Sequence, residues 1–210
     1  ERSIQDADVN LANKNGQIRL MLAARDGDLP TVEALLSSGA AINATDNNGQ
    51  TLLMYAANKG HLTTVQALLG APGIDIHAQN KAGVTALTAA ASNGHSDIVK
   101  VLLDRGANVN VANNEGWTPL MKAAGKGHLT TVQALLGAPR IDIHAQNKGG
   151  VTALTVAALK GYSDIVKALI EHDANVNVAD NNSLTPLMYA AIKGHLTTVQ
   201  ALLGASQIDV

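Results

Sequence analysis

The sequence repeats at a fixed interval. Residues 59–71 read KGHLTTVQALLGA, and the same letters return at 126–138 and at 193–205, each copy 67 residues after the one before. Each block contains two related units, because Thr-centred segments such as GQTLLMYAA (49–57) recur in alternating steps of 34 and 33 residues. A weaker sixth copy, GQIRLMLAA, stands at 16–24. This period predicts stacked supersecondary units, each able to bury its apolar side only against a neighbour.

The sequence of each unit predicts two short helices followed by a turn. Thr118 can cap a helix start through its hydroxyl, and Pro119 suits the first helical position. A Gly-His pair then breaks the helix, and the apolar residues of 129–136 mark a second, amphipathic helix. Segments rich in Asn, Asp and Gly follow, and the Asn-Gly dipeptide at 48–49 favours a tight hairpin. With 1 Trp, 3 Tyr and no Phe, small Ala and Leu residues must fill the core densely.

These motifs resemble those of the ankyrin-repeat family. The family's Thr-Pro-Leu-His tetrapeptide corresponds to TPLM at 118–121 and 185–188, its Gly-His pair is present at 127–128, and its repeat ending appears as GANVN at 106–110. Met or Thr replaces the tetrapeptide His throughout. Ile18 stands where the other copies have Thr, so the first helix of that copy is expected to fray most.

The resemblance implies an all-α repeat solenoid of six stacked helix-turn-helix units with β-hairpin loops. We expect one array over residues 1–210, in which 1–15 is the tail of a truncated preceding repeat. The repeats are predicted at 16–48, 49–82, 83–115, 116–149, 150–182 and 183–210. The last copy keeps Leu196, Val199, Leu202 and Leu203 as internal copies do, so we expect its apolar flank to self-associate, to fray or to be covered by sequence absent from this chain.

Composition excludes several classes of function. A net charge of -2 gives no basic footprint for nucleic acid. Without Cys there is no disulfide framework, thiolate metal site or thiol nucleophile. No apolar run approaches the roughly 20 residues of a membrane-spanning helix, and no secretory signal is visible. We expect a cytoplasmic protein, in a host cell if it is an effector.

Histidines and enzyme motifs give no candidate for catalysis. Four His residues occupy one position in different repeats, so neighbours should lie roughly 10 Å or more apart, whereas zinc ligands converge to about 2 Å of one ion. A structural role, bonding backbone at the break between helices, is the favoured interpretation. The densest run of acid and base groups, Glu171-His172-Asp173, is interpreted as a solvated turn. Phosphate-loop, dinucleotide, zincin and nucleophile-elbow motifs are absent, so no enzyme activity and no cofactor are predicted.

The resemblance implies a binding surface on the hairpin tips and the exposed edge of the first helices. Lys59, Lys126, Lys160 and Lys193 are predicted to form a row of positive charge, although a solvated row inherited by duplication is the alternative. Trp117 is an interface anchor or, alternatively, a side chain lying across its neighbour's tip. The remaining candidates are apolar groups of the C-terminal half and polar groups near the tips: Leu159, Leu184, Tyr189, Ile192, Tyr55, Lys122, Asn114 and Glu115.

Three functional hypotheses remain open. The first is a non-catalytic scaffold that binds a protein partner, which the positive row would make an acidic one. The second is the targeting segment of a larger enzyme or effector whose chemistry lies outside the chain. The third treats the chain as a substrate, because Asn43, Asn110 and Asn177 resemble sites that are hydroxylated in the ankyrin family.

Overall fold

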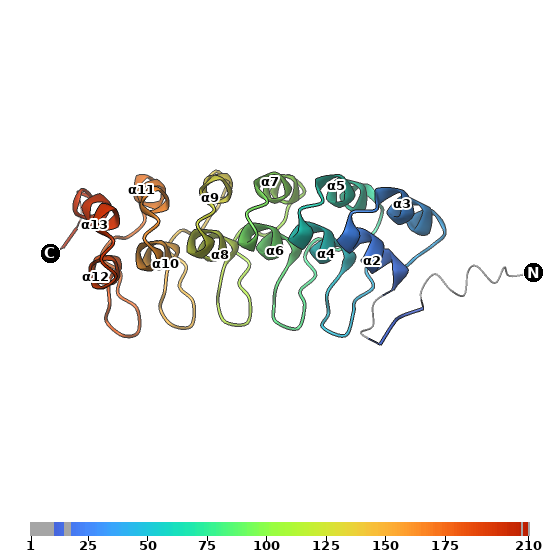
Figure 1. Cartoon of the computed structure of the whole chain (residues 1–210), viewed down its shortest axis with the longest axis horizontal. Coiled ribbons are helices and arrows are strands. Elements are labelled where there is room, and N and C mark those ends of the chain that lie inside the picture. Colours follow the sequence, from blue (N-terminus) through green and yellow to red (C-terminus); the bar gives the residue numbers. More distant parts are fainter. Residues whose placement is uncertain (1–10, 15–17, 207, 210) are drawn as a thin grey trace, which may run out of the picture. The chain divides into compact units, whose positions relative to one another are not determined.

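Pairs of short helices make up the fold (Figure 1). The computed structural model describes residues 11–14, 18–206 and 208–209, so most of the predicted tail at 1–15 lies outside the described residues. The described part contains twelve helices, which form six pairs and confirm the six predicted units. They are α2 (Arg19–Asp26), α3 (Leu29–Ser37), α4 (Leu52–Lys59), α5 (Leu62–Gly70), α6 (Ala86–Ser92), α7 (Ser96–Asp104), α8 (Pro119–Lys126), α9 (Leu129–Leu136), α10 (Ala153–Lys160), α11 (Ser163–Glu171), α12 (Pro186–Ile192) and α13 (Leu196–Leu203).

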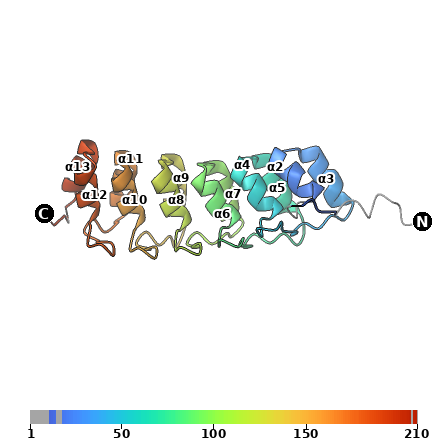
Figure 2. The same cartoon turned by 60° about the horizontal axis from the view of Figure 1, so that its bottom comes forward.

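The chain divides into two compact units, residues 1–108 and 109–210, and each holds three helix pairs. In the first unit α4 packs between α2 and α6, and in the second α10 packs between α8 and α12. Within each unit the second helices form a parallel layer, and the loops project beyond the first helices (Figures 1 and 2). The single array predicted over 1–210 stays a prediction beside these two units.

The first helices begin at the predicted caps. The Oγ1 of Thr118 accepts a hydrogen bond from the backbone N–H of Met121 at 3.3 Å, and Pro119 occupies the first turn. Helices α4, α6, α10 and α12 begin at a Thr in the same way. In α2 the capping position is Ile18, which makes no side-chain bond. The weakest repeat in the sequence therefore lacks a cap that all later first helices have.

Small residues bring neighbouring first helices together. Ala123 and Ala124 in α8, like Ala157 and Ala158 in α10, are completely buried. At Gly125 even a methyl group would be tight, since a Cβ there would lie 3.0 Å from Cγ2 of Val156 on α10. This close approach produces a dense core from Ala and Leu without Phe.

Side chains rather than a strand ladder hold the hairpin loops. The Oδ1 of Asn113 accepts hydrogen bonds from the backbone N–H groups of Glu115 and Trp117, at 3.0 and 2.9 Å. The backbone N–H of Asn113 closes the loop by donating to the carbonyl of Trp117 at 3.0 Å. Across the described residues the only β-pairing is one isolated bridge, between Thr45 and Thr51. The predicted hairpins are thus tight turns with almost no β-structure.

Candidate partner-binding surface

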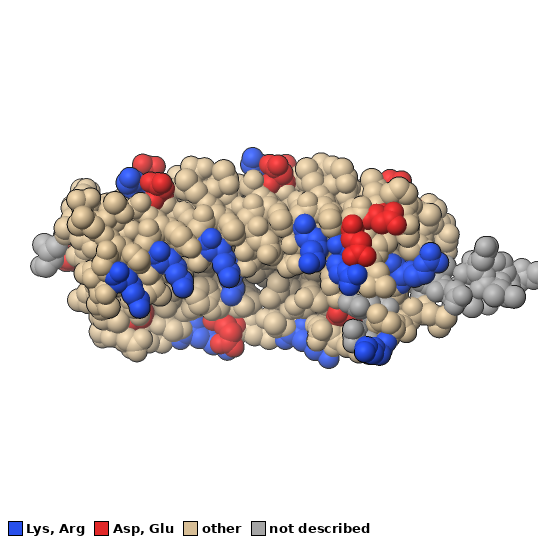
Figure 3. Space-filling view, viewed as in Figure 1, with Lys and Arg blue, Asp and Glu red and all other residues tan. Residues whose placement is uncertain are grey.

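Three lysines of the second unit lie on the exposed edge of consecutive first helices. Lys126 and Lys160 stand in the last turn of α8 and α10, and Lys193 directly follows α12 as its C-cap residue. All three are exposed. Because α10 packs against both α8 and α12, they form a row, which we call the lysine row. Figure 3 shows basic side chains over these helices with no acidic side chain between them.

The members of the lysine row lack the nearby carboxylate that Lys100 and Lys167 have in their own helices. Lys167 lies 3.4 Å from Asp164 one turn earlier in α11, and Lys100 lies 3.7 Å from Asp97 in α7. Among the described residues no carboxylate lies within 4.0 Å of a lysine-row ammonium. The second unit carries seven Lys and Arg and seven Asp and Glu, so the row is a local separation of charge in a neutral unit. Lys59, in the first unit, occupies the same exposed position of α4.

Trp117 and Lys122 form one compact group at the start of α8. The Nζ atom of Lys122 lies 4.7 Å from the centroid of the Trp117 ring, a cation–π distance. Burial is the larger cause, and the charge of Lys126 the smaller, of a lowered pKa for Lys122. The indole is half-buried, so part of its surface stays open to a partner. The exposed residues Asn114 and Glu115 complete this hairpin tip.

The apolar candidates differ in their exposure. Leu159 and Leu184 are half-buried, whereas Ile192 exposes 65% of its surface. Ile192 belongs to a larger apolar surface on the last helix pair, where Leu196 is 67% and Leu203 48% exposed. The equivalent residue of Leu203 in the previous block, Leu136, is only 5% exposed, because a following repeat covers it.

The two candidate tyrosines brace loops instead of pointing freely outward. The hydroxyl of Tyr189 donates to Oδ2 of Asp180 at 2.6 Å, and that of Tyr55 donates to Oδ2 of Asp46 at 2.7 Å. The hydrogen bond from Tyr189 and those from nearby backbone N–H groups lower the pKa of Asp180, and the same bond to Asp180 raises the pKa of Tyr189. Their rings stay half-buried.

Sequence reasoning missed these braces, although the sequence contains their signal. The loop residue is Asp in the two repeats whose first helix carries Tyr nine residues later. It is Asn where that helix residue is Ala89, Lys122 or Val156. Both Asp and Asn can hold the turn through Oδ1, but only Asp supplies a second carboxylate oxygen for a phenol. The choice between them therefore follows the helix residue.

The histidines and the asparagines of the repeat ending join neighbouring repeats. Nε2 of His61 lies 2.9 Å from the carbonyl oxygen of Arg25, and Nε2 of His195 lies 3.2 Å from that of Leu159. Asn110 donates from Nδ2 to the carbonyl of Arg140 and accepts at Oδ1 from the N–H of Asp142, both at 2.8 Å. These contacts confirm the structural interpretation of the repeat histidines. They also give Asn110, like Asn43, a structural role in joining repeats.

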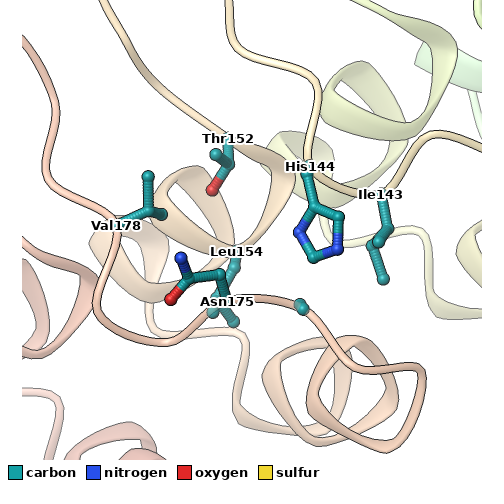
Figure 4. Close-up of a pocket in the computed structure, with 7 residues that line it drawn as sticks. Ile143, His144, Thr152, Leu154, Asn175 and Val178 are labelled. Atoms are coloured by element: carbon teal, nitrogen blue, oxygen red, sulfur yellow. The ribbon is translucent and has the colours of Figure 1, made fainter.

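A hollow of about 260 Å³ opens between two successive loops of the second unit (Figure 4). Ile143 and His144 line it from the loop before α10, and Asn175 and Val178 line it from the following loop. The hydroxyl of Thr152, also in its lining, already caps α10. No carboxylate lines the hollow. In the described part of the chain no three His, Cys, Asp or Glu side chains come together as a metal site would require.

Known proteins show the same architecture. The family model for ankyrin repeats (three copies) matches residues 1–80, 72–147 and 139–210, and the chain belongs to the ankyrin-repeat family. Repeats of this family are in general protein–protein interaction modules. The ankyrin repeat domain of Bcl-3, a member of the IκB protein family, is 31% identical, with a TM-score of 0.81 over 93% of this chain and 86% of that one. An ankyrin repeat domain from Acinetobacter baumannii is also 31% identical, with a TM-score of 0.79 over 89% of this chain and 96% of that one.

Two further observations are negative. No curated protein sequence matches the chain. Among the described residues, no helix combines the length and the apolar character needed to cross a bilayer.

Proposed function

We propose that the chain is a non-catalytic interaction module that binds an acidic protein partner on the edge of its first helices and its hairpin tips. The observation that carries this proposal is the lysine row, whose exposed ammonium groups have no carboxylate within 4.0 Å in the described structure. Unpaired charges of one sign steer an oppositely charged partner and speed its association.

Apolar groups on the first helices and hairpin tips of the second unit support a contact that dissociates slowly. Trp117, Leu159 and Leu184 are half-buried and Ile192 is exposed, so each retains surface that a partner can bury. Aromatic and large aliphatic side chains of this kind are where interfaces concentrate their binding energy. The lysine row would thus govern the association rate, and these anchors the dissociation rate.

Site-specific photo-crosslinking tests the proposed face. A benzoylphenylalanine in place of Leu159 should crosslink to a protein partner in the native cell, while the same group in place of Lys167, on the exposed side of α11, should not. Crosslinks from position 167 with none from position 159 would contradict the proposal. With the captured partner purified, Lys126→Glu, Lys160→Glu and Lys193→Glu combined should slow association by about tenfold or more at low salt.

A further inference from the structure

The lysine row has a spacing that restricts what can pair with it. Its three members occupy one position of α8, α10 and α12, and α10 packs directly against the other two. Packed helix axes lie about 8–10 Å apart. A ligand that meets all three ammonium groups must therefore present acidic groups at about the same interval along one side.

Polypeptide conformations differ in whether they provide this interval. A polyproline II segment has three residues per turn and rises about 3.1 Å per residue, which places every third side chain on one side at about 9.3 Å. In a β-strand, side chains on the same side recur at about 6.6 or 13 Å, and neither distance matches the spacing of packed helices. An α-helix matches only once every seven residues, at about 10.5 Å.

Hydrogen bonding favours the polyproline II segment over the helix. Its backbone makes no internal hydrogen bonds, so its carbonyl groups are free to accept. Each lysine ammonium has three donors and can bond a carboxylate and a backbone carbonyl together. Leu159 and Ile192 directly precede Lys160 and Lys193 in sequence, whereas Gly125 precedes Lys126, so an apolar side chain accompanies two of the three members of the row.

We propose that the lysine row binds an extended acidic polypeptide segment in the polyproline II conformation, with a carboxylate at every third residue. Aliphatic side chains between the carboxylates contact Leu159 and Ile192. This inference rests on the proposed function and names the chemistry of the partner.

A protein segment fits this surface better than a nucleic acid does. Single-stranded nucleic acids bind where aromatic rings form stacking platforms in a basic groove. The second unit is electrically neutral by formal count, and its one Trp is half-buried under Lys122. Carboxylates in register with the lysine row therefore account for the arrangement without a need for base stacking.

Two peptides of identical composition test the register. Glu-Pro-Leu-Glu-Pro-Leu-Glu carries a carboxylate at every third position, and Glu-Glu-Glu-Pro-Leu-Pro-Leu carries the same groups clustered. Binding is measured by anisotropy of the labelled peptides and by the fluorescence of the single Trp117 beside Lys122. We expect the periodic peptide to bind about tenfold more tightly, as several exposed ion pairs formed together would allow.

Matched variants assign the effect to the lysine row. Lys126→Glu with Lys160→Glu should abolish the preference, and Lys100→Glu with Lys167→Glu, which changes the net charge equally, should preserve it. Lys126→Gln with Lys160→Gln repeats the test with a smaller perturbation of the helix ends, and thermal melts establish that every variant folds.

Several outcomes would overturn the inference. Equal affinity for the two peptides would mean that the lysine row does not distinguish between spacings of the carboxylates. Tighter binding of a helical peptide with Glu at every seventh position would show that the bound segment is helical and not in the polyproline II conformation. Equal binding of oligothymidylate or phosphatidylserine vesicles, lost in the same variants, would make the row a general polyanion site. In each case crosslinking from position 159 still tests the proposed function separately.

Discussion

Three buried hydroxyl groups stand out at the scale of single residues. The Oγ1 atoms of Thr64, Thr131 and Thr198 are buried without a hydrogen-bond partner, and each residue is completely inaccessible to solvent. They occupy one position of the second helices α5, α9 and α13, where α7 and α11 have Ile98 and Ile165. Burying an unpaired hydroxyl costs about 1–3 kcal/mol. The protein therefore holds polar groups at a position that an aliphatic residue would fill better.

Replacing these hydroxyls should stabilise the protein. Val has nearly the shape of Thr, so Thr64→Val and Thr131→Val should each raise the free energy of unfolding by about 1 kcal/mol. Chemical denaturation measures the change. Thr63→Val and Thr130→Val alter exposed neighbours in the same helices and should change it by less than about 0.5 kcal/mol. A loss of stability in the buried variants would mean that the hydroxyls are bonded after all.

The bond between Tyr189 and Asp180 predicts a dependence of stability on pH. The folded pKa of Asp180 lies below its ordinary value of 3.8. Stability from this carboxylate is therefore present above pH 3.8 and is lost as the pH falls through the folded pKa. Tyr189→Phe should lower the melting temperature at neutral pH, and its difference from the unaltered protein should shrink on acidification. A difference that stays constant down to pH 2 would contradict this assignment.

Much at the residue scale was predictable from the sequence, because caps and helix ends depend on residues close in the chain. The positions of Thr118 as a helix cap and of Pro119 in the first turn were predicted from the sequence of their own repeat. The stacking of Lys122 on Trp117 and the unpaired hydroxyl of Thr131 could not. Both depend on which rotamer the packed surroundings leave available, and the repeat pattern contains no information about that.

At the scale of elements, a first helix ends against the residue that begins the second helix of the next repeat. Gly127 ends α8 with φ of 79°, and a Cβ there would lie 2.9 Å from Cζ of Tyr162. Gly194 follows the first helix of the last repeat with φ of 71°, and a Cβ there would meet no atom within 4 Å. The two glycines share their backbone conformation, but only Gly127 has a side chain of the next repeat packed against it.

Alanine at these two glycines should separate strain from crowding. Gly194→Ala carries only the cost of a left-handed conformation, about 1 kcal/mol. Gly127→Ala adds the clash with Tyr162 and should cost more, as measured by denaturant unfolding. Tyr162→Ala combined with Gly127→Ala should remove the excess. If both glycine variants cost the same, the tyrosine ring moves aside freely.

Helix positions were predictable, but the detailed form of the loops was not. The Asn-Gly signal at 48–49 correctly predicted a tight turn, but the β-hairpin expected around it is reduced to a single bridge between Thr45 and Thr51. The side chain of Asp46 takes the backbone bonds that a longer ladder would have used. Competition between side-chain and backbone acceptors is decided by geometry within the turn, which sequence periodicity does not resolve.

At the scale of the whole molecule, the last helix pair exposes apolar side chains, two of which have buried counterparts in the preceding block. Leu203 and Met188 are exposed where Leu136 and Met121 are buried, and Leu196 and Ile192 are exposed as well. Of the other two predicted flank residues, Leu202 is buried and Val199 is half-buried. Sequence comparison among repeats predicted part of this surface, because Leu196 and Leu203 are retained from the internal copies. What covers it depends on surfaces beyond these residues, so self-association stays a prediction.

Light scattering over a concentration series tests that prediction. We expect the apparent mass to rise with concentration, since exposed apolar area of this kind drives association. Leu196→Lys with Leu203→Lys should keep the chain monomeric. Gln66→Lys with Gln133→Lys adds the same charge at exposed positions of α5 and α9 and should leave association unchanged. A monomer at every concentration would contradict the expectation.

Within each unit, the main helix contacts are made within a pair or between neighbouring pairs, and the two kinds of repeat alternate along the sequence. Excising one 67-residue block, residues 49–115, would join the repeat at 16–48 to the one at 116–149, the same order of repeat types that α10 and α12 already pair successfully. Unequal recombination between the near-identical blocks would thus shorten or lengthen the protein in steps of two repeats. Proteins derived in this way would have longer or shorter binding surfaces, and no new contact surface between repeats would be needed.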